Sequence, residues 1–244
     1  SSPRSRADPM LFPTAQFGIF FIVVFLVSWR LRPNRRAWMA FTLAASYVFY
    51  GWWDWRFVFL IAASTGFNQV LGTAIFRSHD ESRRKLLMGL AVGGNLVVLG
   101  FFKYYEFFVV SVTNGLAKLG LGADPPLLRI ILPIGISFFT FQAISYVVDI
   151  YRRDLEPATP IEFGMYLSFF PHLVAGPIVR ASEFVPQLRR RPDEHRIPAA
   201  EAFFLIVLGL FKKVVLASWL GTEVVDPVFA VPGNFSALQI LFAV

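Results

Sequence analysis

The sequence predicts an all-α integral membrane protein that crosses the bilayer several times, and three observations predict this class. Hydrophobic residues make up 56% of the 244 residues and charged residues only 16%, whereas a soluble domain carries about 25% charged residues. Several uncharged stretches approach the ~20 apolar residues that a transmembrane helix needs. The basic residues stand in short runs between these stretches, as they do in the cytoplasmic loops of membrane proteins.

The apolar stretches define the expected organisation of the chain. Residues 1–9 are polar, and we interpret them as an extension ahead of a single membrane domain at 10–244. The expected spans are 10–29, 37–53, 57–76, 86–102, 130–148 and 202–219, with a re-entrant segment at 163–179. Gly89 and Gly93 have the spacing of a small-residue packing face. Pro133 would stand in the first turn of its span, where proline is tolerated.

The charges of the loops predict the orientation. With the N-terminus outside, the first and third connections lie in the cytoplasm, and both are rich in basic residues, as the positive-inside rule expects. These residues are Arg30, Arg32, Arg35 and Arg36, then Arg77, Arg83, Arg84 and Lys85. The intervening connection 54–56 holds one Asp and one Arg. Tryptophans at 52, 53 and 55 suit a membrane interface on that other side.

The segment 163–179 conflicts with a simple crossing. If it spanned the membrane, the basic residues after it would lie outside, namely Arg180, Arg189, Arg190, Arg191 and Arg196. Pro171 and the pair Gly176 and Pro177 also oppose a continuous helix. A re-entrant hairpin resolves both conflicts. Because broken backbone at membrane depth must be buried in protein or line a wet cavity, we expect a cytoplasm-facing cavity beside this segment.

His172 lies in the middle of this apolar segment and is the strongest candidate functional residue. An ionisable side chain inside a membrane segment is costly and is a functional-site hypothesis by default. Histidine can serve as a general base near neutral pH. The competing interpretation is structural: a neutral imidazole bonds to a backbone carbonyl that the proline break sets free. Both interpretations stay open on the sequence alone.

Five other polar residues have two interpretations each. Arg180 can hold an anionic group such as a phosphate or anchor the segment at the membrane edge. Lys212 and Lys213 interrupt the span 202–219 and either reach an interface or face a polar interior. Gln142, like Asp149, is expected to pack between helices or at an interface.

Several function classes are excluded or disfavoured. The net charge of +7 accompanies no recognised nucleic-acid-binding fold, so nucleic acid is not an expected partner. The chain has no cysteine, which excludes disulfides and thiolate chemistry. Phosphate-loop, dinucleotide and zinc-protease patterns are absent, and we expect no metal site. Ser137 lacks the later glycine of a nucleophile elbow.

A set of motifs in order along the chain resembles bacterial membrane-bound O-acyltransferases (MBOATs), specifically the alginate O-acetyltransferase branch. The motifs are 50–53 (YGWW), 100–104 (GFFKY), 132–142 (LPIGISFFTFQ), 146–152 (YVVDIYR), 169–180 (FFPHLVAGPIVR), 209–217 (GLFKKVVLA) and 225–229 (VDPVF). The resemblance covers nearly everything from Met10 to Val244, and the motif at 169–180 is the most specific.

The resemblance implies a helical ring around a funnel in the bacterial inner membrane, and transfer of an acyl group to an exported polysaccharide. The donor would be acetyl-CoA on the cytoplasmic side, with no bound cofactor, and periplasmic acetyltransferase proteins would be partners. Candidates for lining the substrate tunnel are Pro171, Gly176, Pro177, Arg180, Gln142, Lys212 and Lys213. The family's essential histidine stands in a Trp-His context that is not found here, so we expect it beyond Val244 and the fold to be incomplete at the C-terminus. These residues alone are therefore expected to be inactive, with His172 a weak catalytic candidate.

Three alternatives remain open. A related protein transfers D-alanine toward teichoic acids, although the histidine-bearing motif argues against it. A transporter would also show broken helices near a cavity, but it is expected to carry inverted repeats, and none is found. A non-catalytic membrane subunit could pass acyl groups to a separate transferase.

Overall fold

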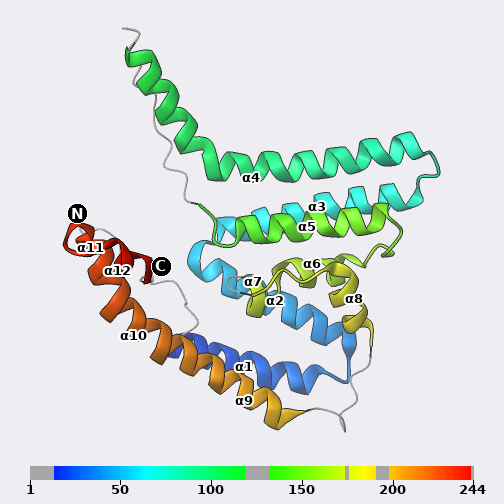
Figure 1. The fold of residues 1–244 in the computed structure, drawn as a ribbon. Helices are drawn as coiled ribbons and strands as arrows, with labels where there is room; N and C mark the ends of the chain where they lie inside the picture. The colour runs from blue at the N-terminus through cyan, green and yellow to red at the C-terminus, as the bar shows by residue number, and fades with distance from the viewer. Residues whose placement is uncertain (1–13, 119–131, 174–175, 191–197, 243–244) are drawn as a thin grey trace, which may run out of the picture. The chain divides into compact units, whose positions relative to one another are not determined.

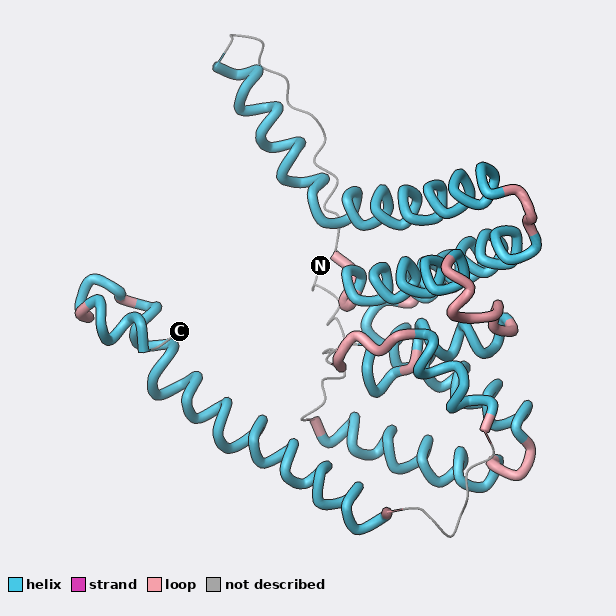
Figure 2. The backbone as a smooth tube through the Cα atoms, turned by 45° about the vertical axis from the view of Figure 1, so that its right-hand side comes forward, coloured by secondary structure: helices cyan, strands magenta, loops and turns pink. Residues whose placement is uncertain are grey.

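The computed structural model describes residues 14–118, 132–173, 176–190 and 198–242. Throughout these residues the regular structure is helical and contains no strand (Figure 2), in agreement with the predicted all-α class. The chain divides into two units, one made mainly of residues 19–190 and one mainly of residues 191–244. Each unit is described by itself.

The first unit begins with three successive helices, α1 (Ala15–Leu31), α2 (Arg35–Asp54) and α3 (Arg56–Arg77). Asn34 caps α2, since its side-chain oxygen accepts a hydrogen bond from the backbone N–H of Ala37 at 3.2 Å. Helix α1 buries only Val24 and exposes a broad apolar surface. In a membrane protein such a surface suits contact with lipid chains.

Helices α3, α4 (Glu81–Lys118) and α5 (Ile136–Tyr151) pack on one another (Figure 1). The buried side chains Asn68 and Asn95 exchange hydrogen bonds between α3 and α4, at 2.7 and 3.2 Å. A buried amide without a partner would cost about 1–3 kcal/mol. This reciprocal pair therefore fixes the register of the two helices inside an apolar layer.

The glycines that allow close packing differ from those expected. A Cβ on Gly89 or Gly93 would meet nothing within 4 Å, so the predicted packing face is wrong. Instead, a Cβ on Gly94 would lie 2.7 Å from the ring of Phe67 on α3, and one on Gly72 would lie 2.9 Å from Ile150 on α5. Gly89 and Gly93 have the expected spacing, but they lie on the exposed side of α4.

The re-entrant hairpin consists of α6 (Pro160–Ser168), the short α7 (Phe170–Leu173) and an extended return that leads to α8 (Ala181–Arg189). Thr159 and Glu162 form a capping box at the start of α6, with Pro160 in the first turn. Helix α6 packs on α2, α3 and α8. The segment thus leaves and returns to the same end of the first unit, as the loop charges predicted (Figure 1).

The connections that were expected on the cytoplasmic side gather at one end of the first unit. In Figure 1 the α1–α2 and α3–α4 connections and the chain after α5 all lie at the right-hand end, whereas the α2–α3 turn lies at the other end. The charge pattern therefore grouped the loops correctly.

The second unit is a nearly continuous helical rod followed by a short turn. It contains α9 (Ala199–Leu210), the π-helical η2 (Phe211–Ala217), α10 (Ser218–Leu220), the π-helical η3 (Gly221–Val225) and α11 (Asp226–Ala230). The 3₁₀ turn η4 (Pro232–Asn234) and α12 (Ala237–Phe242) follow. The rod exposes nearly all its side chains and runs well past the predicted end at residue 219.

Three helical stretches among the described residues are long and apolar enough to cross a membrane: Arg56–Arg77, Glu81–Tyr105 and Ala199–Ala230. Helices α1 and α5 are apolar but shorter, with 17 and 16 residues. Helix α5 begins at Ile136, so the expected place of Pro133 in its first turn is wrong, and Pro133 stands in the turn before the helix. Helix α4 contains the expected span 86–102 and continues to Lys118.

Candidate functional site

The helix break between α6 and α7 creates the most unusual polar environment in the first unit. Pro171 has no backbone N–H to donate, and the N–H of Phe170 bonds to the hydroxyl of Ser46 at 3.3 Å instead of continuing α6. The carbonyl of Tyr166 is therefore left without the partner that a regular helix would supply. A buried carbonyl in this position needs another donor.

His172 supplies that donor. Its side chain is 8% exposed, and its Nε2 lies 3.2 Å from the carbonyl oxygen of Tyr166 and 3.3 Å from Nε2 of Gln142. This is the contact that the structural interpretation of His172 expects. It places two of the predicted site residues, Gln142 and His172, side by side although 30 positions separate them.

The bond to Tyr166 fixes the tautomer of His172. A carbonyl oxygen only accepts, so Nε2 of the neutral imidazole carries the hydrogen, and Nδ1 carries the lone pair. The amide nitrogen of Gln142 then has no acceptor at Nε2, while its buried Oε1 has no partner among the described residues. Exchanging the oxygen and nitrogen of this amide resolves the first conflict, because Oε1 then accepts from the imidazole. Any proton transfer by neutral His172 must therefore use Nδ1.

Aromatic rings surround the imidazole. The ring of Phe169 lies 5.3 Å from the ring of His172, that of Phe184 5.6 Å and that of Phe138 6.4 Å between centroids. These apolar neighbours disfavour a charged imidazole. The site is thus arranged to hold a neutral histidine in one orientation.

The return strand of the hairpin is tied to the outgoing helix. The hydroxyl of Tyr166 donates to the carbonyl of Val179 at 2.8 Å. Gly176 lies against the backbone of His172, and a Cβ there would approach the Cα of His172 to 2.6 Å. Gly135 adopts φ 74°, and a Cβ there would lie 2.7 Å from the carbonyl oxygen of Leu173. The two glycines therefore permit the close contact that holds the tip of the hairpin.

A cluster of charges joins the ends of α2, α6 and α8. Glu162 is 3% exposed and accepts hydrogen bonds from Arg35 at 2.6 Å and from Arg189 at 3.2 Å. It also accepts from the backbone N–H of Thr159 at 2.9 Å. Burial acts to raise the pKa of Glu162, but the bonds from Arg189, Thr159 and Arg35 outweigh burial and lower the pKa to about 2. In the sequence these arginines are recognisable only as loop charges, and no local signal predicts the cluster.

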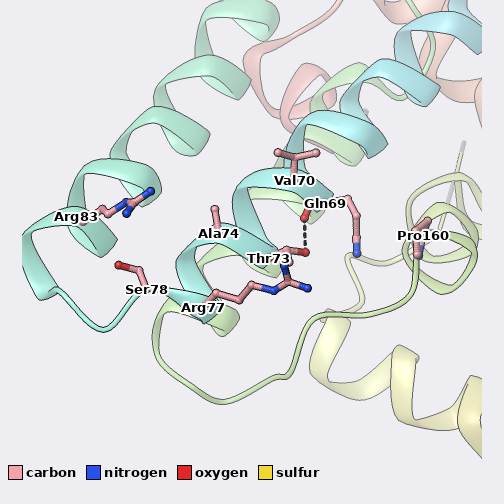
Figure 3. Close-up of a pocket in the computed structure, with 8 residues that line it drawn as sticks. All are labelled: Gln69, Val70, Thr73, Ala74, Arg77, Ser78, Arg83 and Pro160. Atoms are coloured by element: carbon pink, nitrogen blue, oxygen red, sulfur yellow. Dashed lines mark hydrogen bonds between the residues drawn. The ribbon is translucent and has the colours of Figure 1, made fainter.

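A second feature that the sequence analysis missed is an open cleft of about 560 Å³ beside the α3–α4 connection (Figure 3). Its lining residues are Gln69, Val70, Thr73, Ala74, Arg77, Ser78, Arg83 and Pro160. The charge pattern predicted that Arg77 and Arg83 lie in a cytoplasmic loop. It carried no signal that they border a cleft, because Pro160 is far from them in the sequence.

The remaining predicted candidates are placed as follows. Pro171 is half-buried at the helix break, while Pro177 and Arg180 are exposed on the return toward α8. Lys212 and Lys213 are exposed in the π-helical η2 of the second unit. Their roles at a tunnel stay predictions. Among the described residues no group of three or more His, Asp or Glu residues is placed to bind a metal ion.

The fold and site thus define a helical membrane protein with a broken-helix hairpin that holds a buried histidine. Comparisons with known proteins show which proteins have similar sequences. The chain is 39% identical over 218 residues to "Probable alginate O-acetylase AlgI" of Pseudomonas aeruginosa, a match that covers 86% of this chain and 40% of the relative. It is 32% identical over 200 residues to a peptidoglycan O-acetyltransferase of Helicobacter pylori, covering 71% of this chain and 37% of the relative.

A teichoic acid D-alanyltransferase of Lacticaseibacillus rhamnosus is 29% identical over 171 residues, which cover 64% of this chain and 42% of the relative. No family model and no solved structure matches the chain. The chain spans about two fifths of the length of these curated relatives. It is homologous over most of its own length to the alginate O-acetylases of the MBOAT family, and the resemblance predicted from its motifs is confirmed.

Proposed function

We propose that these residues belong to a membrane O-acetyltransferase that passes an acetyl group from a cytoplasmic donor to hydroxyls of an exported polysaccharide. The observation that carries the proposal is the 39% identity to an alginate O-acetylase over 218 residues. Acetyl-CoA is the proposed donor. The proposed acceptor is a glycan such as alginate or the peptidoglycan strand, because relatives named for both match the chain.

The proposed role of this part of the protein is to build the wall of the substrate path. The re-entrant hairpin supplies a rigid break in the membrane layer, and His172 holds that break in place through Tyr166. Precise placement of donor and acceptor accounts for much of the rate in a two-substrate transfer. As a catalytic candidate, His172 would act through Nδ1 as general base on the acceptor hydroxyl. We also propose that the essential histidine of the family lies beyond Val244 and completes the active site.

Acetyl transfer is favoured over D-alanyl transfer by a specific observation. Alginate O-acetylases match this chain at 34–39% identity over 218–228 residues, whereas D-alanyltransferases match it at 29% over 171 residues and 31% over 99 residues. The two functions also differ in donor, since D-alanyl transfer would depend on a carrier protein. Labelled acetyl-CoA therefore distinguishes them.

The experiment uses membranes from cells that make the full gene product and membranes from cells that lack it. Both are given radiolabelled acetyl-CoA and a deacetylated acceptor glycan, and alkali-labile label on the glycan is measured. The proposal expects label only with the gene product present. Equal labelling in both membranes would contradict it.

The proposed orientation places the N-terminus outside and the α3–α4 connection in the cytoplasm of an inner-membrane protein. These 244 residues contain no cysteine, so Ser78→Cys introduces one label site among them, and labelling of the unaltered protein is subtracted. An impermeant maleimide should label this site in inverted vesicles and not in intact spheroplasts. The reverse result would contradict the orientation.

A further inference from the structure

We propose that the cleft beside the α3–α4 connection binds a phosphate-bearing ligand through Arg77 and Arg83. Figure 3 shows Arg77 extending from the end of α3 and Arg83 standing on the neighbouring α4, and both line the cleft of about 560 Å³. Small-molecule sites have volumes of about 300–1,000 Å³. The cleft is therefore larger than a bare phosphate ion requires.

The arginines around this connection fall into two groups. Arg84 is held by Glu81 at 3.0 Å and by the carbonyl of Tyr151. Arg153 bonds to the carbonyl of Phe76 at 2.9 Å. These two arginines hold the connection against the end of α5, and their charges serve the fold.

Arg77 and Arg83 form the other group. Both side chains are exposed, and within the described residues neither has a carboxylate partner. The nearby acids are already in use. Asp80 accepts from the backbone N–H groups of Ser82 and Arg83 at 3.2 Å and caps α4, and Glu81 binds Arg84. Two guanidinium groups are thus available to an anion.

The neutral polar groups of the cleft have little bonding capacity left. Gln69 donates to the carbonyl of Ala158 at 2.6 Å and accepts from the hydroxyl of Tyr146 at 3.1 Å. The hydroxyl of Thr73 donates to the carbonyl of Gln69 at 2.8 Å (Figure 3). Selectivity therefore rests on the guanidinium groups, whose planar forks match phosphate oxygens.

The cleft is also built on a rigid support. Helices α3 and α4 are joined by the buried Asn68–Asn95 pair, and Arg153 fastens their connection to α5. A ligand that binds here orders only the two arginine side chains. This preorganisation reduces the entropy lost on binding.

Two ligands share the required chemistry: the headgroup of an anionic phospholipid and the phosphate groups of soluble CoA. The CoA source rests on the proposed function and the lipid source does not. The test uses the full gene product in nanodiscs. Binding of CoA is measured by calorimetry in phosphatidylcholine discs, and retention of phosphatidylglycerol from mixed discs is measured by mass spectrometry.

The cleft variant is Arg77→Gln with Arg83→Gln, and the matched control is Arg30→Gln with Arg36→Gln. The control removes the same charge from exposed arginines of the α1–α2 connection at the same end of the unit. We expect the cleft variant to bind one of the two probes about tenfold more weakly or worse, and the control to change binding by less than about twofold.

If the cleft variant binds CoA more weakly, the ligand of the cleft is soluble CoA. If CoA does not bind and the cleft variant retains less phosphatidylglycerol, the ligand is the phospholipid headgroup. The inference is overturned if neither probe binds the unaltered protein, or if the control weakens binding as much as the cleft variant. Unfolding midpoints verify that both variants fold, and the single variants Arg77→Gln and Arg83→Gln replace the double one if its midpoint falls. Because binding needs no acceptor glycan, intact binding with failed acetyl transfer separates this inference from the proposed function.

Discussion

Replacing Glu162 with glutamine should destabilise the first unit, because the change removes the negative charge between Arg35 and Arg189. Glutamine keeps the shape and one acceptor oxygen, so the loss is mainly electrostatic. Glu162 is 3% exposed, whereas the two arginine side chains are 43% and 40% exposed. Breaking a buried pair costs about 3–5 kcal/mol. Solvent screening of the arginines reduces our expected loss to about 2–3 kcal/mol.

The lowered pKa of Glu162 indicates a loss of unfolding free energy of similar size, and it also predicts that this loss depends on pH. The carboxyl has a pKa of about 2 in the folded protein against an ordinary value of 4.5. A shift of this size corresponds to about 3 kcal/mol before screening. Because the folded pKa is lowered, the stabilisation is complete above pH 4.5 and is lost as the pH falls toward 2.

The assay is reversible unfolding in detergent micelles, followed by tryptophan fluorescence at neutral pH and at several values between pH 5 and 2. The matched control is Glu183→Gln, since Glu183 is an exposed carboxylate on α8 with no ion pair in the described structure. We expect the unaltered protein to lose its advantage over Glu162→Gln as the pH falls. If Glu162→Gln is as stable as Glu183→Gln at neutral pH, the reasoning about this cluster is refuted.

Three further predictions concern the helix break and the α3–α4 pair, each measured by the same unfolding assay. His172→Ala leaves the carbonyl of Tyr166 buried without a donor and should cost about 1–3 kcal/mol; an unchanged midpoint would show that the imidazole does not cap the break. Gly176→Ala forces a Cβ against the backbone of His172 and should cost about 1–3 kcal/mol, while Gly209→Ala, which meets open space within a helix, should not destabilise and can stabilise by about 1 kcal/mol. Asn68→Leu should cost about 1–3 kcal/mol by stranding its partner on α4; adding Asn95→Leu should recover most of that loss, and a simple sum of two losses would contradict the pairing.

The loop charges and helix breakers in the sequence predicted the broad architecture well. The positive-inside pattern grouped the α1–α2 and α3–α4 connections at one end, and Pro171 with Gly176 indicated the re-entrant hairpin. These signals are local. They are strong in a membrane protein, because an unpaired backbone group in the bilayer costs free energy and basic residues collect in cytoplasmic loops.

The details that depend on contacts between distant residues were not predictable in this way. Gln142 and His172 were separate candidates, and nothing in their spacing indicated that they touch. The partners of Glu162 come from residues 127 and 27 positions away. The packing glycines were misplaced because the small-residue spacing does not indicate which side of α4 faces its neighbours. The start of α5 was also misjudged, because Pro133 stands in the turn before the helix and not in its first turn.

We propose that this protein takes part in O-acetylation of an exported polysaccharide. The most direct measurement is the amount of ester-linked acetate on that polysaccharide, determined by proton NMR in cells with the gene, without it and with it restored. The account predicts that the acetate is lost with the gene and returns with the restored copy. Unchanged acetylation in cells without the gene, under conditions where the gene is normally expressed, would contradict the account.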